Sequence, residues 1–386
     1  MKQIITTERK PIKLWLDDIE EGALEQAKNL ANLPCTYLWV AIMPDSHQGY
    51  GMPIGGVLAT TDVVIPNAVG VDIGCGVSVV RTSLKEIDIK AIKNIMSAIR
   101  KKVPRGFAHH KEKQHWKGFD RAPKIPVITE ELEAARYQLG TLGGGNHFME
   151  IQKGSDGYIW LMLHSGSRNF GYKIANSFHQ KALRLIKEKR IDLPDKDLAY
   201  LPLQSREAKE YLDAMNFALD FARENRRKMM KAMKESVAEV IGEEDVTFDE
   251  MVDIHHNYAA QETHFDREVI VHRKGATAAK YGQIGIIPGS QGTKSYIVKG
   301  KGNPESFMSC SHGAGRKIGR KEAQRTLCLK HETQFLDDQG VIHTLRHQRD
   351  LDEAAGAYKD INEVMKNQED LVEILVELTP LAVIKA

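Results

Sequence analysis

The segment Val69-Gly70-Val71-Asp72-Ile73-Gly74-Cys75-Gly76 places two potential metal ligands among glycines, between short runs of β-branched residues. From residue 41 to residue 80, such runs alternate with glycine turns, which predicts strands joined by tight loops. Apolar residues at helical spacing then predict long helices over 169–189 and 205–240. Because strands and helices are mixed along one chain, the expected fold class is α+β.

The rest of the chain continues this mixture. The other expected elements are helices over 17–32, 87–103 and 352–366, a strand over 158–163, strands and turns over 268–295, and a strand-forming tail over 371–384. Residues 104–126 are expected to form a loop, and residues 313–328 a glycine loop followed by a basic helix. Candidate chemical residues run from Asp72 to Lys385, so we expect one large domain over residues 1–386, with mixed sheets and helices around a central metal and nucleotide cleft.

The composition is typical of a globular protein: 386 residues, 42% hydrophobic and 27% charged, enough to bury a sizeable core. The formal net charge is only +2, so a nucleic-acid partner would have to be bound by local basic patches. Four cysteines without a CxxC pair argue against a disulfide framework and a zinc knuckle. The first residues are too polar for a signal peptide and no apolar run could span a bilayer, so we expect a cytoplasmic enzyme without a membrane partner.

Asp72 and Cys75 lie three residues apart in a loop whose glycines let both side chains converge. A thiolate binds divalent metals strongly and can bridge two ions. A lone Asp-x-x-Cys is more often a buried structural cysteine beside a turn aspartate. The histidines farther along the chain favour the metal interpretation.

Those histidines occur at three places. His147 follows three glycines and precedes Phe148 and Glu150, an aromatic face and an acid suited to a purine ring and its NH groups. His164 ends an apolar strand before Ser-Gly-Ser-Arg, a suitable place for a ligand beside a phosphate, although alone it would be read as a core histidine. His255 and His256 are adjacent, so at most one is expected to be a direct ligand, and the residues leave that choice open.

The stretch Ser311-His312-Gly313-Ala314-Gly315-Arg316-Lys317 has the composition of a phosphate-binding loop. Glycine N–H groups can cradle phosphate oxygens, and the two cations can neutralise them. A histidine in this setting can attack phosphorus and form a phosphoramidate. A helix start with a capping serine would explain the glycines but not His312 together with the basic residues. Two weaker glycine turns are expected over 43–56, with Asp45 and His47 in a polar loop, and over 287–295.

Taken in order, these motifs resemble those of the RtcB-type RNA ligases, the GTP- and manganese-dependent enzymes of RNA splicing and repair. The resemblance covers residues 43–386 and rests on Asp-Ile-Gly-Cys-Gly, Gly-Gly-Gly-Asn-His-Phe-x-Glu, His-Ser-Gly-Ser-Arg, His-His-Asn and Ser-His-Gly-Ala-Gly-Arg. It implies an RtcB-like fold. One departure is Asn169-Phe170 after Gly-Ser-Arg, where the family often has Gly-Leu, and this leaves the choice of RNA substrate open.

The resemblance also implies roles for individual residues. Two Mn²⁺ ions would be held by Asp72, Cys75, His147, His164 and His256, with Cys75 as the bridge. His312 would be the nucleophile that takes GMP from GTP. The guanylate would be surrounded by Asn146, Phe148, Glu150, Asn257, Pro288, Gly289, Ser290, Gln291, Ser295, Gly313, Ala314, Gly315, Tyr358 and Lys385. From the residues alone, a thiolate with three imidazoles would favour Zn²⁺, so manganese is implied by the resemblance only.

The implied reaction joins an RNA 3′-phosphate or 2′,3′-cyclic phosphate end to a 5′-hydroxyl end through a histidine–GMP intermediate and an activated RNA 3′ end. It belongs to tRNA splicing or RNA repair, and whether an activating protein takes part stays open. The alternative is a metal-dependent phosphoesterase acting on RNA ends without covalent guanylylation. A third reading, a non-catalytic RNA-binding scaffold, is disfavoured because five such ligands would be costly to keep together without metal.

Three basic stretches are candidates for RNA contact, over 101–124, 223–234 and 316–325. For residues 223–234, a solvated helix face is an equally good interpretation. RNA binding through phosphates should weaken as salt is added.

Overall fold

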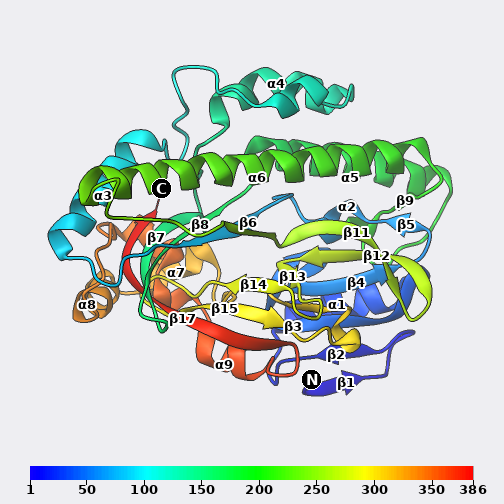
Figure 1. The fold of residues 1–386 in the computed structure, drawn as a ribbon. Coiled ribbons are helices and arrows are strands. Elements are labelled where there is room, and N and C mark those ends of the chain that lie inside the picture. The colour runs from blue at the N-terminus through cyan, green and yellow to red at the C-terminus, as the bar shows by residue number, and fades with distance from the viewer. Residues whose placement is uncertain (386) are drawn as a thin grey trace.

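The computed structural model describes residues 1–385, and their mixture of sheets and helices confirms the expected α+β class. Within these residues, one sheet has six strands and another has seven. Figure 1 shows the two sheets side by side, with two long helices, α5 (Asn169–Glu188) and α6 (Arg206–Ile241), lying along one side of both.

The six-stranded sheet has the order β1-β2-β3-β4-β12-β11. Its strands are β1 (Gln3–Ile5), β2 (Ile12–Leu14), β3 (Thr36–Tyr50), β4 (Met52–Thr60), β12 (Arg267–Lys274) and β11 (Asn257–His264). Helix α1 (Glu21–Ala31) packs Ala27 and Leu30 into a core shared with Val40 and Leu58 of this sheet. The long β3–β4 hairpin carries the polar residues 45–50 to the edge where the second sheet begins.

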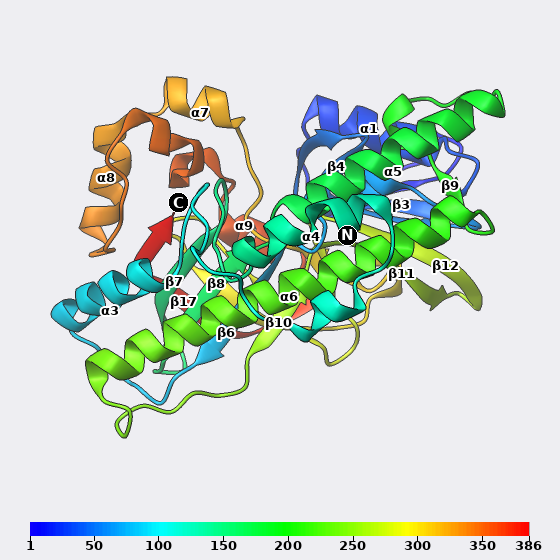
Figure 2. The same cartoon turned by 90° about the horizontal axis from the view of Figure 1, so that it is seen from above.

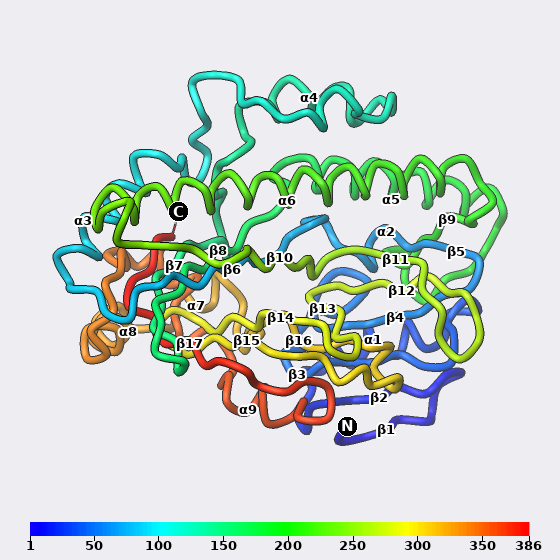
Figure 3. Tube along the Cα trace, in the orientation of Figure 1, coloured from blue at the N-terminus to red at the C-terminus, as the bar shows by residue number. Residues whose placement is uncertain are grey.

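The seven-stranded sheet has the order β10-β6-β8-β7-β17-β15-β14, and every neighbouring pair with a defined register is antiparallel. Its strands are β10 (Val252–His255), β6 (Gly76–Arg81), β8 (Ile159–Ser165), β7 (Phe148–Gly154), β17 (Val372–Lys385), β15 (Ser295–Gly300) and β14 (Ile284–Ile287). Figure 3 traces β17 back from α9 (Ile361–Lys366) into this sheet. There Lys385 pairs with Phe148, so the last part of the chain lies beside residues from its middle.

At one point the chain passes directly from one sheet into the other. Strand β10 belongs to the seven-stranded sheet and β11 to the six-stranded one, and only His256 separates them. Two small ladders complete the strands: β13 (Ala276–Ala278) with β16 (Ser309–Ser311), and β5 (Val63–Val64) with β9 (Leu201–Pro202).

The helices cover the sheets with their apolar faces. Ser205 caps α6 by accepting a hydrogen bond from the N–H of Ala208, and Phe217 and Phe221 of α6 pack against Phe170 of α5. Figure 2 shows α6 crossing the molecule from end to end, with α5 beside one half of it and α3 (Ile89–Lys102) near its far end. The remaining helices are α2 (Pro66–Val69), α4 (Pro126–Gln138), α7 (Arg320–Thr326) and α8 (Leu329–Asp338). No helix within residues 1–385 combines the length and apolarity needed to cross a bilayer.

Several expected elements are confirmed, and others are wrong. The helices expected over 17–32, 87–103, 169–189 and 205–240 and the strand-forming tail are present as α1, α3, α5, α6 and β17. The single helix expected over 352–366 is wrong: 3₁₀ turns at Gln348–Glu353 and Ala355–Ala357 are followed by extended Tyr358 before α9 begins. Tyr358 is extended because it bridges to Arg316 of another segment, a tertiary contact without a local signature.

The polar loop expected over 43–56 is also wrong. Strand β3 continues through Tyr50, and irregular pairing with β4 after Ile42 lets Asp45 turn into the protein interior, fully buried. The loop expected over 104–126 contains a 3₁₀ turn at Lys117–Arg121 and leads directly into α4, which the sequence analysis did not identify, and α8 was likewise missed. The basic helix expected within 313–328 is limited to α7.

Candidate active site

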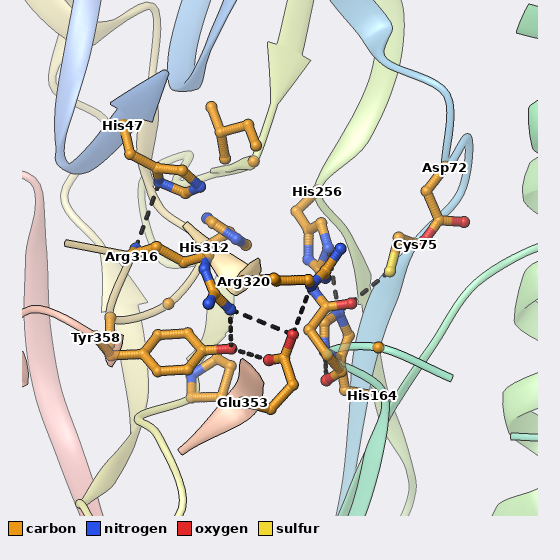
Figure 4. Close-up of a pocket in the computed structure, with 18 of the residues that line it drawn as sticks. His47, Asp72, Cys75, His164, His256, His312, Arg316, Arg320, Glu353 and Tyr358 are labelled. Atoms are coloured by element: carbon orange, nitrogen blue, oxygen red, sulfur yellow. Dashed lines mark hydrogen bonds and ion pairs between the residues drawn. The ribbon is translucent and has the colours of Figure 1, made fainter. Parts of the chain in front are cut away.

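A cavity of about 950 Å³ lies where the two sheets meet. Its wall combines Gln48 and Lys274 from the six-stranded sheet with Glu150 and His164 from the seven-stranded sheet. Figure 4 shows Asp72 and Cys75 to one side of it, His256 and His312 near the centre, and Glu353 with Tyr358 at another side. The cavity therefore brings together segments that are far apart in the sequence.

Five potential ligands form two groups that share one sulfur. Cys75, His164 and His256 form one group and Asp72, Cys75 and His147 the other, and the ligand atoms of each group lie within 4.8 Å of one another. The Cys75 Sγ lies 3.1 Å from Nε2 of His164 and 3.5 Å from Nε2 of His147. The five residues that the resemblance implies as ligands are thus brought together.

The sheet register explains this convergence. His164 lies on β8 opposite Val77 of β6 and Phe148 of β7. Cys75 immediately precedes β6 and His147 immediately precedes β7, so antiparallel pairing brings both to the same edge as His164. His256 follows β10, the other neighbour of β6, and its N–H donates to the Cys75 carbonyl at 2.9 Å. Four ligands therefore come from adjacent strands of one sheet.

The hydrogen bonds of the imidazoles suit metal binding. Nδ1 of His147 lies 2.8 Å from the Leu142 carbonyl and Nδ1 of His164 lies 3.1 Å from the Asn146 carbonyl. A carbonyl can only accept, so both Nδ1 atoms carry the proton and both Nε2 atoms present a lone pair toward Cys75. Burial also lowers the pKa of His164 far below its usual value, which keeps the ring neutral, as a ligand must be.

The cysteine shows what a cation would add. Burial, together with neighbouring Asp72, raises the pKa of the Cys75 thiol well above its usual range. A divalent cation at this point would stabilise the thiolate instead. The donor set of one thiolate, one carboxylate and three imidazoles therefore fits a divalent-metal centre, with the sulfur common to both ligand groups.

The adjacent histidines, which the residues alone left open, have separate surroundings. His256 joins the ligand cluster, with its Nε2 3.3 Å from Nε2 of His164. His255 points the other way, with its Nδ1 3.0 Å from the Gly74 carbonyl and 3.1 Å from Nη2 of Arg226. The geometry thus agrees with the ligand that the resemblance implies.

Arg226 supports the cluster from behind. It is fully buried, pairs with Asp253 at 2.5 and 2.9 Å, and donates from Nη1 to the carbonyls of Gly74 and Ser165, both at 2.9 Å. These carbonyls belong to the residues next to Cys75 and His164. The stretch 223–234 is therefore not a continuous basic face, since Arg226 points inward and Arg227 pairs with Glu224.

His312 is held by an aspartate that the sequence analysis noted only as part of a weak turn. Its Nδ1 lies 2.6 Å from Oδ2 of Asp45, and the same oxygen accepts from the backbone N–H groups of His312 at 3.0 Å and Gly313 at 3.3 Å. Burial alone would raise the pKa of Asp45, but His312 lowers it below its usual value. An ionised Asp45 keeps the proton on Nδ1, which leaves the Nε2 lone pair of His312 available.

Most residues expected around the guanylate line the cavity. They are Asn146, Phe148, Glu150, Asn257, Pro288, Gly289, Ser290, Gln291, Gly313, Ala314, Gly315, Tyr358 and Lys385. Ser295 instead lies behind the wall, where its Oγ accepts from the N–H of Gly289 at 3.1 Å. The Asn257 amide is engaged with the protein, donating to the Asp72 carbonyl at 3.0 Å and accepting from the N–H of Gly275 at 2.8 Å. Both side chains therefore help to hold the wall in place through hydrogen bonds to the backbone.

Glu353 organises the far wall, and nothing in its sequence context signals this. Its carboxylate accepts from Arg316 at 3.2 Å, Arg320 at 2.8 Å and Lys385 at 3.5 Å, and from the Tyr358 hydroxyl. Burial alone would raise its pKa, but the charges of Lys385, Arg320 and Arg316 lower it to about 2. Arg316, expected within a basic stretch for RNA, is thus committed to a buried ion pair.

Glu150 has the opposite electrostatic environment. Burial raises its pKa to about 8, although nearby Lys385 and a 2.6 Å hydrogen bond from Gln152 favour the ionised form. A protonated carboxyl at this point can donate a hydrogen bond as well as accept one. The cavity wall therefore offers a carboxyl that can adapt to the donor and acceptor pattern of a bound base.

Comparison with known proteins finds relatives along nearly the whole chain. Residues 26–386 match the family model described as tRNA-splicing ligase RtcB. The chain is 37% identical to the RNA-splicing ligase RtcB of Escherichia coli strain K12, over 99% of each chain. It is 32% identical to the tRNA-splicing ligase RtcB of Pyrobaculum aerophilum and 31% identical to that of Thermococcus kodakarensis, in both cases over 98% of this chain and 95% of the relative.

Proposed function

The chain belongs to the RtcB family of RNA-splicing ligases, and we propose that it joins RNA 3′-phosphate or 2′,3′-cyclic phosphate ends to 5′-hydroxyl ends, using GTP and Mn²⁺. One observation carries the GTP-dependent step: buried Asp45 holds Nδ1 of His312 at 2.6 Å beside the ligand cluster. We treat residues 1–386 as one ligase domain, because its centre uses residues from Asp45 to Lys385.

His312 is the proposed nucleophile. With the proton on Nδ1 and bound to Asp45, Nε2 can attack the α-phosphorus of GTP. The new N–P bond replaces the bond to the bridging oxygen, and pyrophosphate leaves with its electron pair. As Nε2 becomes bonded to phosphorus, the ring gains positive charge, which the Asp45 carboxylate stabilises.

The nucleotide is placed against the wall that Glu353 organises. Phe148 offers an aromatic face, and Glu150 and the Pro288–Gln291 turn offer donors and acceptors around the base. N–H groups of Gly313 and Gly315 and the cation of Lys385 lie in the same wall, where they can meet the phosphate. Each of these residues acts by binding and orienting the guanylate next to His312.

Asp72, Cys75, His147, His164 and His256 would hold two Mn²⁺ ions. When bound, the ions would supply positive charge that offsets the charge on attacking and leaving oxygens.

GMP on His312 is then transferred to the RNA 3′-phosphate, with the N–P bond broken and a P–O–P link formed. The 5′-hydroxyl of the second RNA end attacks that activated end, GMP leaves, and the strand is sealed. A cyclic end is first opened by water.

The test is to incubate the protein with GTP labelled at the α-phosphorus and Mn²⁺, followed by a denaturing gel. We expect a labelled band that is stable in alkali and labile in acid, as a phosphoramidate on histidine is. His312→Ala should lose the band and keep its bound metal. Labelling of His312→Ala would refute the nucleophile, and absence of label in the wild type, with release of terminal phosphate from RNA, would favour the phosphoesterase alternative.

A further inference from the structure

The cavity continues beyond the residues assigned so far. Figure 4 shows His47 on the opposite side of His312 from Glu353 and Tyr358. On the side of His47, the wall continues with Gln48, Gly49, Tyr50, Asn67, Val71 and Lys274, which we call the hairpin wing. None of these residues belongs to the ligand cluster or to the residues expected around the guanylate.

Tyr50 is the unusual member of this wing. It lies at the tip of the β3–β4 hairpin, beside Gly51, whose φ of +68° makes the tight turn. Tyr50 lines the cavity and is nevertheless 74% exposed. An aromatic ring left open at the mouth of a cavity is a surface on which a nucleobase can stack, because every base has a π face.

The backbone that carries Tyr50 is fixed by hydrogen bonds from other elements. The ammonium of Lys274 donates to the carbonyls of Tyr50 at 2.6 Å and Asn67 at 3.1 Å. Gln26 of α1 binds Gly49 twice, donating to its carbonyl at 2.7 Å and accepting from its N–H at 3.0 Å. The backbone that carries the ring is therefore braced at the cavity mouth, which lowers the ordering cost of binding a base there.

Transfer of GMP from His312 to RNA brings two nucleotides to one atom, the phosphorus of the bound GMP. On the proposed function, on which this inference rests, GMP occupies the side of Phe148 and Tyr358. The RNA terminal phosphate attacks the phosphorus of that GMP from the side opposite the His312 nitrogen, so its own base lies within one nucleotide of that phosphorus and outside the wall that holds the guanylate. The hairpin wing is a part of the cavity wall that neither GMP nor the ligand cluster occupies.

We propose that the hairpin wing binds the terminal nucleotide of the RNA strand that ends in a 3′-phosphate, with Tyr50 stacked on its base. Gln48 and Asn67 lie in the same wall and supply polar groups for the sugar and base edges. Stacking on an aromatic ring tolerates any base, so the wing positions the RNA end without demanding a sequence.

The experiment measures binding of a fluorescent single-stranded RNA with a 3′-phosphate, at constant salt, to the wild type and three variants. Tyr50→Ala should bind about 30-fold more weakly, the middle of the range for loss of one stacked base, and Tyr50→Phe should bind as the wild type because the ring is retained. Tyr281→Ala is the matched control, because Tyr281 is 86% exposed but lies outside the cavity wall. Thermal unfolding checks that each variant keeps its fold.

A second RNA, lacking only the base of its 3′-terminal nucleotide, makes the test specific. The wild type should bind it as weakly as Tyr50→Ala binds the intact RNA, and Tyr50→Ala should lose nothing further with it. Equal binding of intact RNA by Tyr50→Ala and wild type, or an equal loss in Tyr281→Ala, would overturn the proposal. So would a loss confined to RNA that offers only a 5′-hydroxyl end.

The remaining arm separates the RNA base from the base of GTP. If Tyr50→Ala instead raises the GTP concentration needed for GMP attachment, with RNA binding retained, the wing belongs to the nucleotide and the proposal fails. Conversely, Tyr50-dependent RNA binding in a protein that forms no GMP adduct would support the wing and sink the proposed function.

Discussion

The proposed ligand cluster and the wall around His312 adjoin in one cavity but are built in different ways. Four of the ligands, Cys75, His147, His164 and His256, come from the ends of adjacent strands in one sheet. The wall around His312 is instead formed by β3, the segment after β16, the 3₁₀ turn at Gln348–Glu353 and the end of β17. The first depends on the register of one sheet, and the second on how distant segments dock.

This difference separates residues that act directly from residues that hold them. The metal ligands and His312 are chemically distinctive, so a motif can announce them. Asp45 binds His312 itself, Arg226 donates to backbone carbonyls next to two of the ligands, and Glu353 binds cations of the cavity wall. An aspartate, arginine or glutamate has many other uses in a sequence. Removing members of each class should therefore have separable effects on metal binding and on GMP attachment.

The largest effect is expected for Cys75→Ala, which removes the sulfur shared by both ligand groups. Bound Mn²⁺ and GMP attachment should both fall, by more than the roughly 10- to 100-fold that follows loss of a hydrogen-bond partner behind a ligand. Metal content by atomic spectroscopy and labelling with GTP measure the two losses. Full metal content with full activity would refute the shared role of the sulfur.

Asp45→Asn should separate the two regions. The amide cannot keep the proton on Nδ1 as a carboxylate does, so a fraction of His312 carries it on Nε2 and cannot attack. We expect GMP attachment to slow by roughly 10²- to 10⁴-fold, the usual range for losing an acid–base partner. Metal content should stay at the wild-type level, and its loss together with the rate would place Asp45 in the metal centre instead.

Arg226→Lys should weaken the ligand cluster without touching it. Lysine keeps the charge beside Asp253 but cannot reach this carboxylate and both the Gly74 and Ser165 carbonyls with one planar fork. We expect Mn²⁺ affinity to fall about tenfold, with GMP attachment restored by excess Mn²⁺. Arg227→Lys, on the exposed side of the same helix, is the matched control and should bind Mn²⁺ normally.

The smallest effect on chemistry is expected from titration of Glu353, which should appear in stability. Its pKa is lowered to about 2 in the folded protein, from 4.5 when free, so it stabilises the fold above about pH 4.5, and this contribution disappears as the pH falls toward 2. The contribution is on the order of 3 kcal/mol. The free energy of unfolding, measured in urea, should fall less steeply between pH 5 and 3 for Glu353→Gln than for the wild type.

Asp352, the neighbour of Glu353, offers a control because its pKa is shifted in the opposite direction. Burial raises the pKa of Asp352, so this carboxyl favours the folded state at low pH and opposes it at neutral pH. Asp352→Asn should therefore make the acid-side fall in stability steeper than in the wild type. Equal slopes for the two variants would contradict the assignment of the opposed pKa shifts.

Much of the fold follows from local sequence patterns, and the predictions that were wrong have tertiary causes. The long helices and β17 were predictable because their periodicity matches the faces they bury. Asp45 was expected in a loop, because nothing local shows that β3 continues past Pro44 under pairing with β4. Tyr358 was expected in a helix, although its bridge to Arg316 holds it extended.

The sequence by itself determined the chemical inventory: one carboxylate, one thiolate, three imidazoles and a histidine followed by a glycine-rich, basic stretch, in an order that specifies the family. Only the tertiary structure decided which of the two adjacent histidines joins the cluster, that Asp45 fixes the proton of His312, and that Glu353 gathers three cations. The physical reason is that residue type sets what a side chain can bind. Which partner it meets, and in which protonation state, depends on strand register, burial and contacts between distant segments.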